Sequence, residues 1–250
     1  MPARPKQARS TDVTTAVAET LAWLERRGTK KTRDGMARYG ITAKKAYGVT
    51  MGTMLGLRKK LGRDQELAVA LFRTGWYEAR IMASFVGDPE RLSAAQMDSW
   101  ARAFDSWAVC DSMCFHLFDR TPHAWAKVNE WAKRDEEFVK RASFALIASL
   151  TVHDKEAPDT AFLKALSHIE KAAFDPRNFV KKAVNWALRS VGKRNAVLNA
   201  ASVDVAKRLA QSEDPAARWV GKDALRELTS AGVQRRLAKK KARPAAKRRS

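Results

Sequence analysis

Apolar residues recur along the chain at intervals of three and four positions, within long segments rich in Ala, Leu, Lys, Arg and Glu. This interval is the period of an α-helix, and these residue types are strong helix formers. Strict alternation of apolar and polar residues, which would indicate strands, is nearly absent. The pattern predicts an all-α domain over residues 10–234.

Short signals at the ends of these segments support the helical prediction. Asp88-Pro89, Asp175-Pro176 and Asp214-Pro215 each place a capping carboxylate before a proline, which the first turn of a helix tolerates. Gly192 and Gly232 stand where helices should stop, because glycine readily adopts the conformation that ends a helix. We expect helices to begin at the three Asp-Pro pairs and to end at the two glycines.

One short pattern occurs three times, at steps of 41 and 40 residues. Phe138-Val139-Lys140-Arg141-Ala142 is matched by Phe179-Val180-Lys181-Lys182-Ala183 and, more loosely, by Trp219-Val220-Gly221-Lys222. Each copy follows an acidic helix start and continues into an apolar helix, which is typical of the helix-pair repeats of HEAT and armadillo proteins. The alternative is chance similarity among amphipathic helices, since the residues upstream of each copy repeat less clearly.

The repeat gives a prediction about charge. Stacked repeats place equivalent positions side by side, so Arg141, Lys182 and Lys222 should form one row. A row of cations on one face of a curved solenoid would follow a phosphate backbone and contact several successive phosphates. On the alternative reading, each charge only solvates its own helix.

The overall charge also indicates a polyanionic partner. The chain has 48 Lys and Arg against 27 Asp and Glu, a formal net charge of +21. Twelve of the basic residues and none of the acidic ones lie in segments 1–9 and 235–250, so the central part keeps a net charge of +9. Nucleic acid is the natural partner for such a surface.

The two terminal segments are predicted to be disordered. Nine of the sixteen residues of segment 235–250 are basic and none is acidic, and the segment offers no apolar face that could pack. Such a segment cannot bury enough surface to offset the entropy lost on ordering. Two roles are open for it: solubility, or an arm that binds DNA through diffuse charge.

No segment approaches the run of about 20 apolar residues that a membrane span requires. The N-terminus also lacks the apolar stretch of a secretory signal. We therefore expect a cytoplasmic protein without a membrane partner, associated with the nucleoid if the source is bacterial.

Cysteine usage argues against both a disulfide framework and a metal site. The chain contains only Cys110 and Cys114, whose spacing places them on one helix face. A thiolate metal site would need at least two further ligands, and only His116 lies close by. We interpret both cysteines as small buried residues and expect no bound metal.

Two pairs of residues combine an indole with a charged group. Trp107 and Asp111 are four residues apart and Trp186 and Arg189 three apart, so each pair shares one helix face. Trp186 also lies one turn beyond Lys182, on the side of the proposed row of cations. Tryptophan is also a common core residue, and the other six are most simply interpreted as packing: Trp23, Trp76, Trp100, Trp125, Trp131 and Trp219.

The order and spacing of several short motifs over about residues 20–230 resemble one known family. The motifs are Met36-Ala37-Arg38-Tyr39, Tyr47-Gly48-Val49, Gly56-Leu57-Arg58-Lys59, Glu66-Leu67-Ala68, Ser106-Trp107 with Asp111, Val139-Lys140-Arg141-Ala142 and 182–189 (KAVNWALR). Together they are similar to the DNA alkylation repair family of HEAT-like-repeat DNA glycosylases, the AlkD type.

The resemblance implies a fold and an activity. The fold is a right-handed α-solenoid of HEAT-like repeats, about six in number, with a concave basic face that holds duplex DNA. The activity is cleavage of the N-glycosidic bond of N3- or N7-alkylated purines, without metal or cofactor. We accordingly expect double-stranded DNA with alkylated purines as the substrate, and a monomeric protein.

The resemblance also assigns roles to residues. The catalytic carboxylate falls on Asp111 and the two cleft tryptophans on Trp107 and Trp186. The contacts to DNA fall on the cleft residue Tyr39 and on the arginines Arg141 and Arg189, beside the Lys182 and Lys222 of the row.

The chemistry of these residues fits the reaction. A 3- or 7-alkylpurine is cationic, and an indole face attracts a cation by roughly 0.5–2 kcal/mol. Departure of the base leaves an oxocarbenium-like sugar, which a fixed carboxylate such as Asp111 stabilises. The family resemblance further implies an open cleft, in contrast to the deep pocket used by enzymes that extrude a base.

One departure from the family pattern keeps other functions open. The family member used for comparison has a second tryptophan before the catalytic segment, where this chain has Ser106. The alternatives are a non-catalytic HEAT-repeat protein that recognises damaged or branched DNA, and a protein-binding scaffold.

Overall fold

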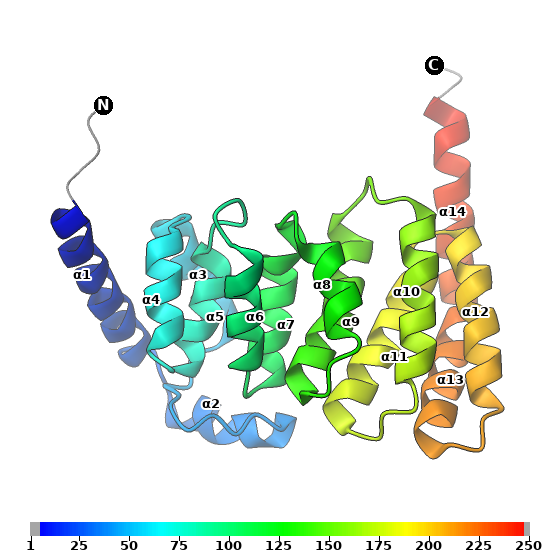
Figure 1. Ribbon diagram of the computed structural model, residues 1–250, viewed down its shortest axis with the longest axis horizontal. Coiled ribbons are helices and arrows are strands. Elements are labelled where there is room, and N and C mark those ends of the chain that lie inside the picture. The colour runs from blue at the N-terminus through cyan, green and yellow to red at the C-terminus, as the bar shows by residue number, and fades with distance from the viewer. Residues whose placement is uncertain (1–5, 248–250) are drawn as a thin grey trace. The chain divides into compact units, whose positions relative to one another are not determined.

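The computed structural model describes residues 6–247, with side chains for residues 12–239, and every regular element in this range is a helix (Figure 1). The prediction of an all-α protein is confirmed. The chain divides into two compact units, Met1–Pro122 and His123–Ser250. No helix among the described residues is both long enough and apolar enough to span a membrane.

The first unit is built around one buried helix, α5. The helices of this unit are, in chain order, α1 (Lys6–Glu25), α2 (Lys30–Gly35), η1 (Met36–Tyr39), α3 (Met51–Leu61), α4 (Gln65–Arg73), α5 (Tyr77–Val86), α6 (Ala94–Arg102), α7 (Trp107–His116) and η2 (Phe118–Arg120). Helices α1, α3, α4 and α7 all contact α5. Residues Ala79, Ile81, Met82 and Val86 of α5 are fully buried, so burial of this helix organises the core of the unit.

A buried carboxylate on α5 holds the irregular segment 40–50. Glu78 is fully buried, and its carboxylate accepts hydrogen bonds from the backbone N–H groups of Tyr47, Gly48 and Val49 at 3.0, 2.7 and 3.2 Å. Three N–H donors replace the water that a buried carboxylate loses, and they also satisfy backbone groups that no helix or strand pairs. The position of segment 40–50 therefore depends on Glu78.

The same segment makes two further close contacts. Gly48 has a φ of 85°, and a Cβ there would overlap the backbone of Thr29 and Arg33, so only glycine fits. The ring of Tyr47 stacks on Trp76, with centroids 3.9 Å apart and planes inclined by 5°. Backbone and side-chain contacts thus order a segment that has no regular secondary structure.

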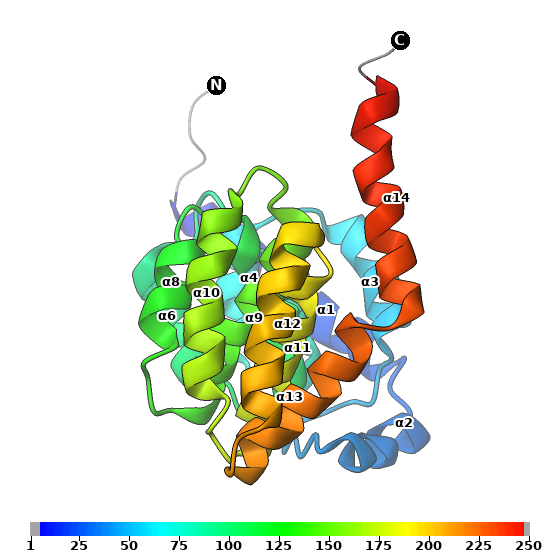
Figure 2. The same cartoon turned by 90° about the vertical axis from the view of Figure 1, so that its right-hand side faces the viewer.

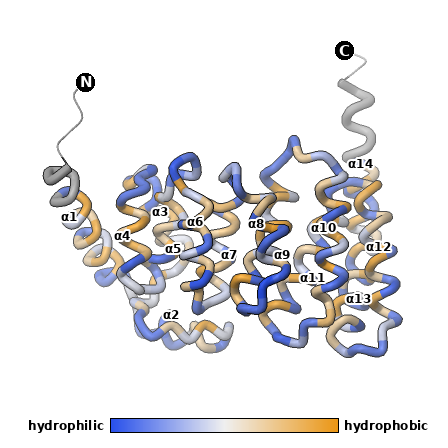
Figure 3. The backbone as a smooth tube through the Cα atoms, in the orientation of Figure 1, coloured by the Kyte–Doolittle hydropathy of each residue, from blue (hydrophilic) through white to orange (hydrophobic). Residues whose placement is uncertain are grey.

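The second unit is a stack of helix pairs. Its helices are α8 (Ala124–Trp131), α9 (Glu137–His153), α10 (Asp159–Ala172), α11 (Asn178–Gly192), α12 (Ala196–Ala210), α13 (Pro215–Leu228) and α14 (Ala231–Lys247). Helices α8, α10 and α12 form one layer and α9, α11 and α13 the other, and each pair of consecutive helices packs together (Figures 1 and 2). Hydrophilic residues gather at the connections, and hydrophobic ones lie along the helices (Figure 3).

The packing of this unit confirms the sequence repeat. The three copies lie within the first two turns of α9, α11 and α13, and the equivalent residues Val139, Val180 and Val220 are all buried. The rings of Phe138 and Phe179, another equivalent pair, are 5.5 Å apart. Equivalent positions of neighbouring repeats therefore lie side by side, as stacking requires.

The third copy departs from the other two for a steric reason. Gly221 replaces the lysine found at Lys140 and Lys181, and a Cβ at this position would overlap the backbone of Leu209 and Ala210. Helices α12 and α13 approach so closely there that no side chain fits.

The predicted helix boundaries have mixed outcomes. Asp214 caps α13 through the N–H groups of Ala216 and Ala217, and α11 ends at Gly192, so these two predictions are confirmed. Asp88-Pro89 lies in a turn, and α6 begins later, after the capping residue Ser93. Gly232 lies inside α14, so the stop predicted there is wrong.

Asp175 has a different role from the cap that the sequence predicts. Helix α11 begins only at Asn178, and the Asp175 carboxylate instead binds the backbone N–H and the guanidinium of Arg177. The hydrogen bond from the Arg177 side chain holds the pKa of Asp175 below its ordinary value. This ion pair stabilises the loop that connects α10 and α11.

The disorder expected at both termini is wrong for the residues that the structure describes. Helix α1 begins at Lys6, and α14 continues through residues 235–247. Val233 and Leu237, four residues apart, are buried and form an apolar contact at the start of α14. The basic composition of segment 235–250 gave no indication of this contact. Residues 1–5 and 248–250 lie outside the described part of the chain.

Replacement of Glu78 tests its role in the first unit. Glu78→Gln places an amide N–H₂ against one of the three backbone donors and removes the charge, so we expect the free energy of unfolding to fall by about 2 kcal/mol. Chemical denaturation monitored by tryptophan fluorescence measures this change. The matched substitution of the exposed Glu90, Glu90→Gln, should change it by less than about 0.5 kcal/mol. Equal midpoints for Glu78→Gln and the parent chain would show that the segment does not depend on this carboxylate.

Candidate functional site

The start of α7 presents the predicted catalytic pair. Trp107 is the first residue of this helix and Asp111 lies one turn later, so both project from one face. Ser106 is the capping residue: it is buried, and its hydroxyl accepts a hydrogen bond from the N–H of Ala108 at 3.3 Å. The serine that departs from the family pattern thus stabilises the helix that carries the pair.

Trp107 is tied to a distant part of the first unit. Its indole N–H donates a hydrogen bond to the backbone carbonyl of Tyr39 at 2.8 Å, across 68 positions of sequence. Tyr39 ends η1, where Gly40 takes up a left-handed conformation with a φ of 70°. This hydrogen bond restrains the orientation of the indole ring and brings Tyr39 beside it.

Tyr39, Trp107 and Asp111 line one cleft of about 720 Å³ within the first unit. Most of the other lining residues are apolar or aromatic, and they include Met36, Ile41, Val49, Met51 and Tyr77. Tyr39 is the most exposed residue of this group, at 71 %, whereas Trp107 and Asp111 are half-buried. The cleft therefore combines a carboxylate, three aromatic rings and several apolar side chains.

The two cysteines lie on the buried side of the same helix. Cys110 and Cys114 are fully buried, and burial, together with a hydrogen bond between the two thiols that favours the protonated form of Cys114, raises the pKa of the Cys114 thiol well above its ordinary value. Such a thiol is unreactive. Among the described residues, no group of three or more His, Cys, Asp or Glu side chains could hold a metal ion.

The remaining predicted residues belong to the second unit. Trp186 and Lys182 lie on α11 and Lys222 lies on α13, and these two helices pack against each other. Both lysines are exposed and Trp186 is half-buried. Lys182 and Lys222 thus occupy neighbouring, accessible positions.

Arg141 does not match the other two members of the predicted row. It is only 5 % exposed, and its Nη1 donates a hydrogen bond of 2.6 Å to the backbone carbonyl of Phe179 on the next repeat. An arginine can bury its long side chain while it satisfies a carbonyl between helices. Arg141 is therefore less accessible than Lys182 and Lys222, and its predicted contact with DNA stays a prediction.

Arg189 is held by acidic residues of the neighbouring repeat. Its Nη1 lies 2.5 Å from Glu227 and 3.8 Å from Asp223 of α13, and Lys193 also pairs with Glu227 at 2.7 Å. Burial by itself would raise the pKa of Glu227, but the two cations hold it below its ordinary value. Arg189 therefore links two repeats in addition to any contact with a ligand.

Sequence reasoning missed two features of the molecule. Glu78 positions the segment that lines the cleft, and its signal in the sequence is an acidic residue on the same helix face as the apolar Met82 and Phe85. Trp219, interpreted as packing, is 41 % exposed, and Lys181 lies 5.1 Å from the centre of its ring. The signal in the sequence is that Trp219 occupies the position of Phe138 and Phe179 in the other two copies of the repeat.

Comparisons with known proteins identify the family and the fold of the chain. A family model described as "DNA alkylation repair enzyme" matches residues 20–228. No curated protein matches significantly. A solved structure, from a family described as related to the HEAT-like repeat DNA glycosylases with affinity for branched DNA structures, superposes with a TM-score of 0.70. The alignment covers 83 % of this chain and 93 % of that one at 20 % identity, which supports the HEAT-like fold. Because the family model spans most of the sequence, the chain belongs to the DNA alkylation repair enzyme family.

Proposed function

We propose that this protein is a DNA glycosylase that binds duplex DNA and hydrolyses the N-glycosidic bond of cationic N3- and N7-alkylpurines. The observation that carries the proposal is the cleft that combines Trp107 with Asp111 on one face of α7. Membership of the DNA alkylation repair family supports the same conclusion.

The indole of Trp107 supplies a recognition element for positive charge. An alkylpurine and the sugar of its transition state are both cationic, and an aromatic face attracts cations by about 0.5–2 kcal/mol. The hydrogen bond to the Tyr39 carbonyl restrains the ring before the ligand arrives. Less conformational freedom is then lost on binding.

Asp111 supplies the negative charge that the reaction needs. Loss of the alkylated base leaves positive charge on the sugar, and a carboxylate held beside it stabilises the transition state more than the ground state. The base is already a good leaving group because of its charge, so no general acid is required. Asp111 also accepts a proton from the attacking water as the new C–O bond forms.

The second unit contributes contacts to the DNA in this proposal. Lys182 and Lys222 are exposed on adjacent helices and bind backbone phosphates, and Trp186 lies one turn from Lys182 on the same helix. Arg189 adds a contact close to Trp186 on the same helix.

A second candidate function is binding of branched DNA without cleavage. The superposed relative is described as having affinity for branched DNA structures, and Trp219 offers an exposed ring on which an unpaired base can stack. Replacement of the second cleft tryptophan by Ser106 favours the same candidate. Release of free base distinguishes the two functions.

Replacement of Asp111 tests the proposed reaction. The protein should release 7-methylguanine from duplex DNA under single-turnover conditions, with the free base measured by chromatography. Asp111→Asn should slow this release by roughly a hundredfold or more and leave DNA affinity nearly unchanged, since the lost charge stabilises only the transition state. The matched control Asp98→Asn, on α6, should release base at the parent rate. Equal rates for Asp111→Asn and the parent would show that Asp111 takes no part in the reaction. If the parent releases no base, the glycosylase function is contradicted and binding of branched DNA without cleavage becomes the favoured function.

Replacement of the two exposed lysines tests the contact with the DNA backbone. Lys182→Gln and Lys222→Gln should each reduce the slope of log affinity against log salt by about 0.9, the value for one phosphate contact on duplex DNA. Lys164→Gln, on the other layer of the second unit, is the control and should leave the slope unchanged. Arg141→Gln should instead lower the unfolding midpoint, because Arg141 is buried. An unchanged slope for the double lysine variant would show that these residues do not face the DNA.

A further inference from the structure

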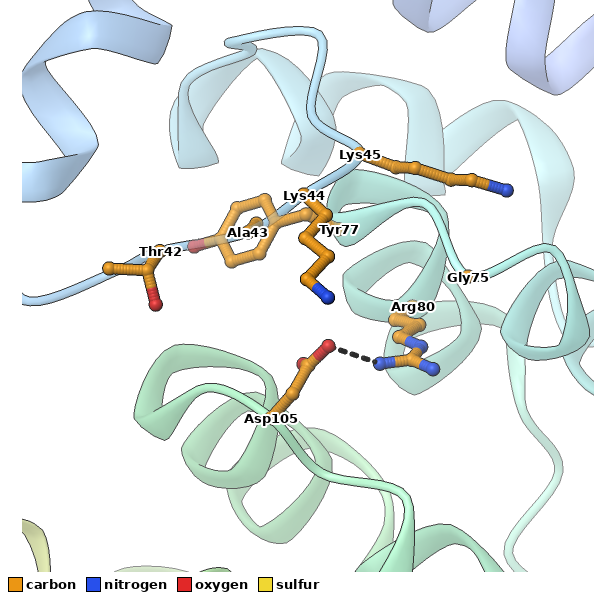
Figure 4. A pocket seen from close by; sticks show the side chains of 8 residues that line it. All are labelled: Thr42, Ala43, Lys44, Lys45, Gly75, Tyr77, Arg80 and Asp105. Carbon is orange, nitrogen blue, oxygen red and sulfur yellow. Dashed lines mark ion pairs between the residues drawn. The ribbon is translucent and has the colours of Figure 1, made fainter.

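A second pocket of the first unit lies next to the cleft. It has a volume of about 470 Å³ and is lined by Thr42, Lys44, Lys45, Tyr77, Arg80 and Asp105, with Ala43 and Gly75 (Figure 4). Tyr77 lines both the pocket and the cleft. Asp105 also stands two residues before Trp107, so the two hollows share one wall and one connecting segment.

The cations of this pocket are held in place by the fold. Lys44 and Lys45 lie on the segment that Glu78 binds, and the backbone carbonyl of Lys45 accepts a hydrogen bond of 2.9 Å from the N–H of Tyr77. Burial raises the pKa of Tyr77 to about 12, with the Glu78 carboxylate adding to the effect. The tyrosine hydroxyl therefore keeps its proton and adds no negative charge to the pocket.

Arg80 forms the base of the pocket and uses only part of its donor capacity. Its Nη1 contacts the Asp105 carboxylate at 3.0 Å and the Ala103 carbonyl at 3.3 Å, and its guanidinium lies 5.1 Å from the centre of the Phe72 ring. The buried Nε has no hydrogen-bond partner within the described part of the chain. A guanidinium has five N–H donors, so Arg80 can hold Asp105 and the Ala103 carbonyl and still donate to a further anion.

The charges of the pocket are unbalanced. Lys44 and Arg80 place two positive charges beside the single carboxylate of Asp105, which is 64 % exposed, whereas the Lys45 side chain extends away from this group (Figure 4). The Lys44 ammonium points toward Asp105 and Arg80, and none of the described residues pairs with it (Figure 4). The pocket therefore carries an excess of positive charge. The Asp105 carboxylate occupies the place beside Arg80 that a bound anion would take.

We propose that this pocket binds one phosphodiester group of the DNA strand whose modified nucleotide occupies the adjacent cleft, and that Asp105 takes the place of this phosphate when DNA is absent. Lys44 and Arg80 bind the two non-bridging oxygens of this phosphate. The inference rests on the proposed binding of DNA by the cleft, but it does not depend on cleavage.

Two substitutions with opposite effects follow from this arrangement. Lys44→Gln removes a cation from the phosphate and should weaken binding about tenfold. Asp105→Asn removes the competing carboxylate and should strengthen binding about threefold to tenfold, because Arg80 no longer has to give up an ion pair. Both residues are exposed, so neither change disturbs the core.

Neutral phosphate analogues locate the contact. The probe is a series of duplexes with 2′-fluoro-7-methylguanosine, whose glycosidic bond resists cleavage, and with one uncharged methylphosphonate at successive linkages around the lesion. The parent protein should lose about tenfold in affinity at one linkage through this pocket. Lys44→Gln should show a smaller loss at that linkage, because only Arg80 still contacts the phosphate there, and the gain of Asp105→Asn should disappear there. Lys59→Gln and Glu90→Gln, at exposed positions outside the pocket, are the controls.

The outcomes separate this inference from the proposed function. If Lys44→Gln and the parent lose affinity equally at every linkage, or if Asp105→Asn binds no more tightly, the pocket is not a phosphate site, whether or not base is released. If both variants change affinity only at that linkage and no base is released, the phosphate site is supported and the proposed glycosylase function is contradicted. A protein that does not bind these duplexes at all overturns both.

Discussion

The first unit depends on one buried carboxylate. Glu78 lies in the central helix α5 and accepts three backbone hydrogen bonds from a segment that has no helix of its own. A buried charge is tolerable only where several donors replace its hydration, so the segment and the carboxylate stabilise each other. Because residues 40–50 contribute to the lining of both the cleft and the basic pocket, the shape of each depends in part on this interaction.

The functional groups are distributed between rigid helices and this held segment. Helix α7 presents Trp107 and Asp111, and its capping serine stabilises the turn from which they project. The segment contributes the apolar residues Ile41 and Val49 to the cleft and the two lysines to the pocket. A site that stabilises developing charge gains from such preorganisation, because no rearrangement is needed when the reaction occurs.

Local periodicity predicted the helices and the repeat, because the burial of Val139, Val180 and Val220 is imposed by the same spacing in each copy. It also predicted that Trp107 and Asp111 share a face, since that depends only on helical geometry. The role of Glu78, the burial of Arg141 and the orientation of Trp107 depend on partners 29 to 68 residues away, which no local pattern contains. The helical state of residues 235–247 was missed because two apolar residues, Val233 and Leu237, suffice to pack the start of α14.

The central claim is that the cleft of α7 holds the modified nucleotide at the moment of reaction. The most direct test is a crystal structure of the protein bound to a duplex with the uncleavable 2′-fluoro-7-methylguanosine. The account predicts that the sugar of this nucleotide contacts the Trp107 ring and that its anomeric carbon lies within roughly 4 Å of the Asp111 carboxylate, close enough for strong charge stabilisation. A complex in which the modified nucleotide lies away from both residues would contradict it.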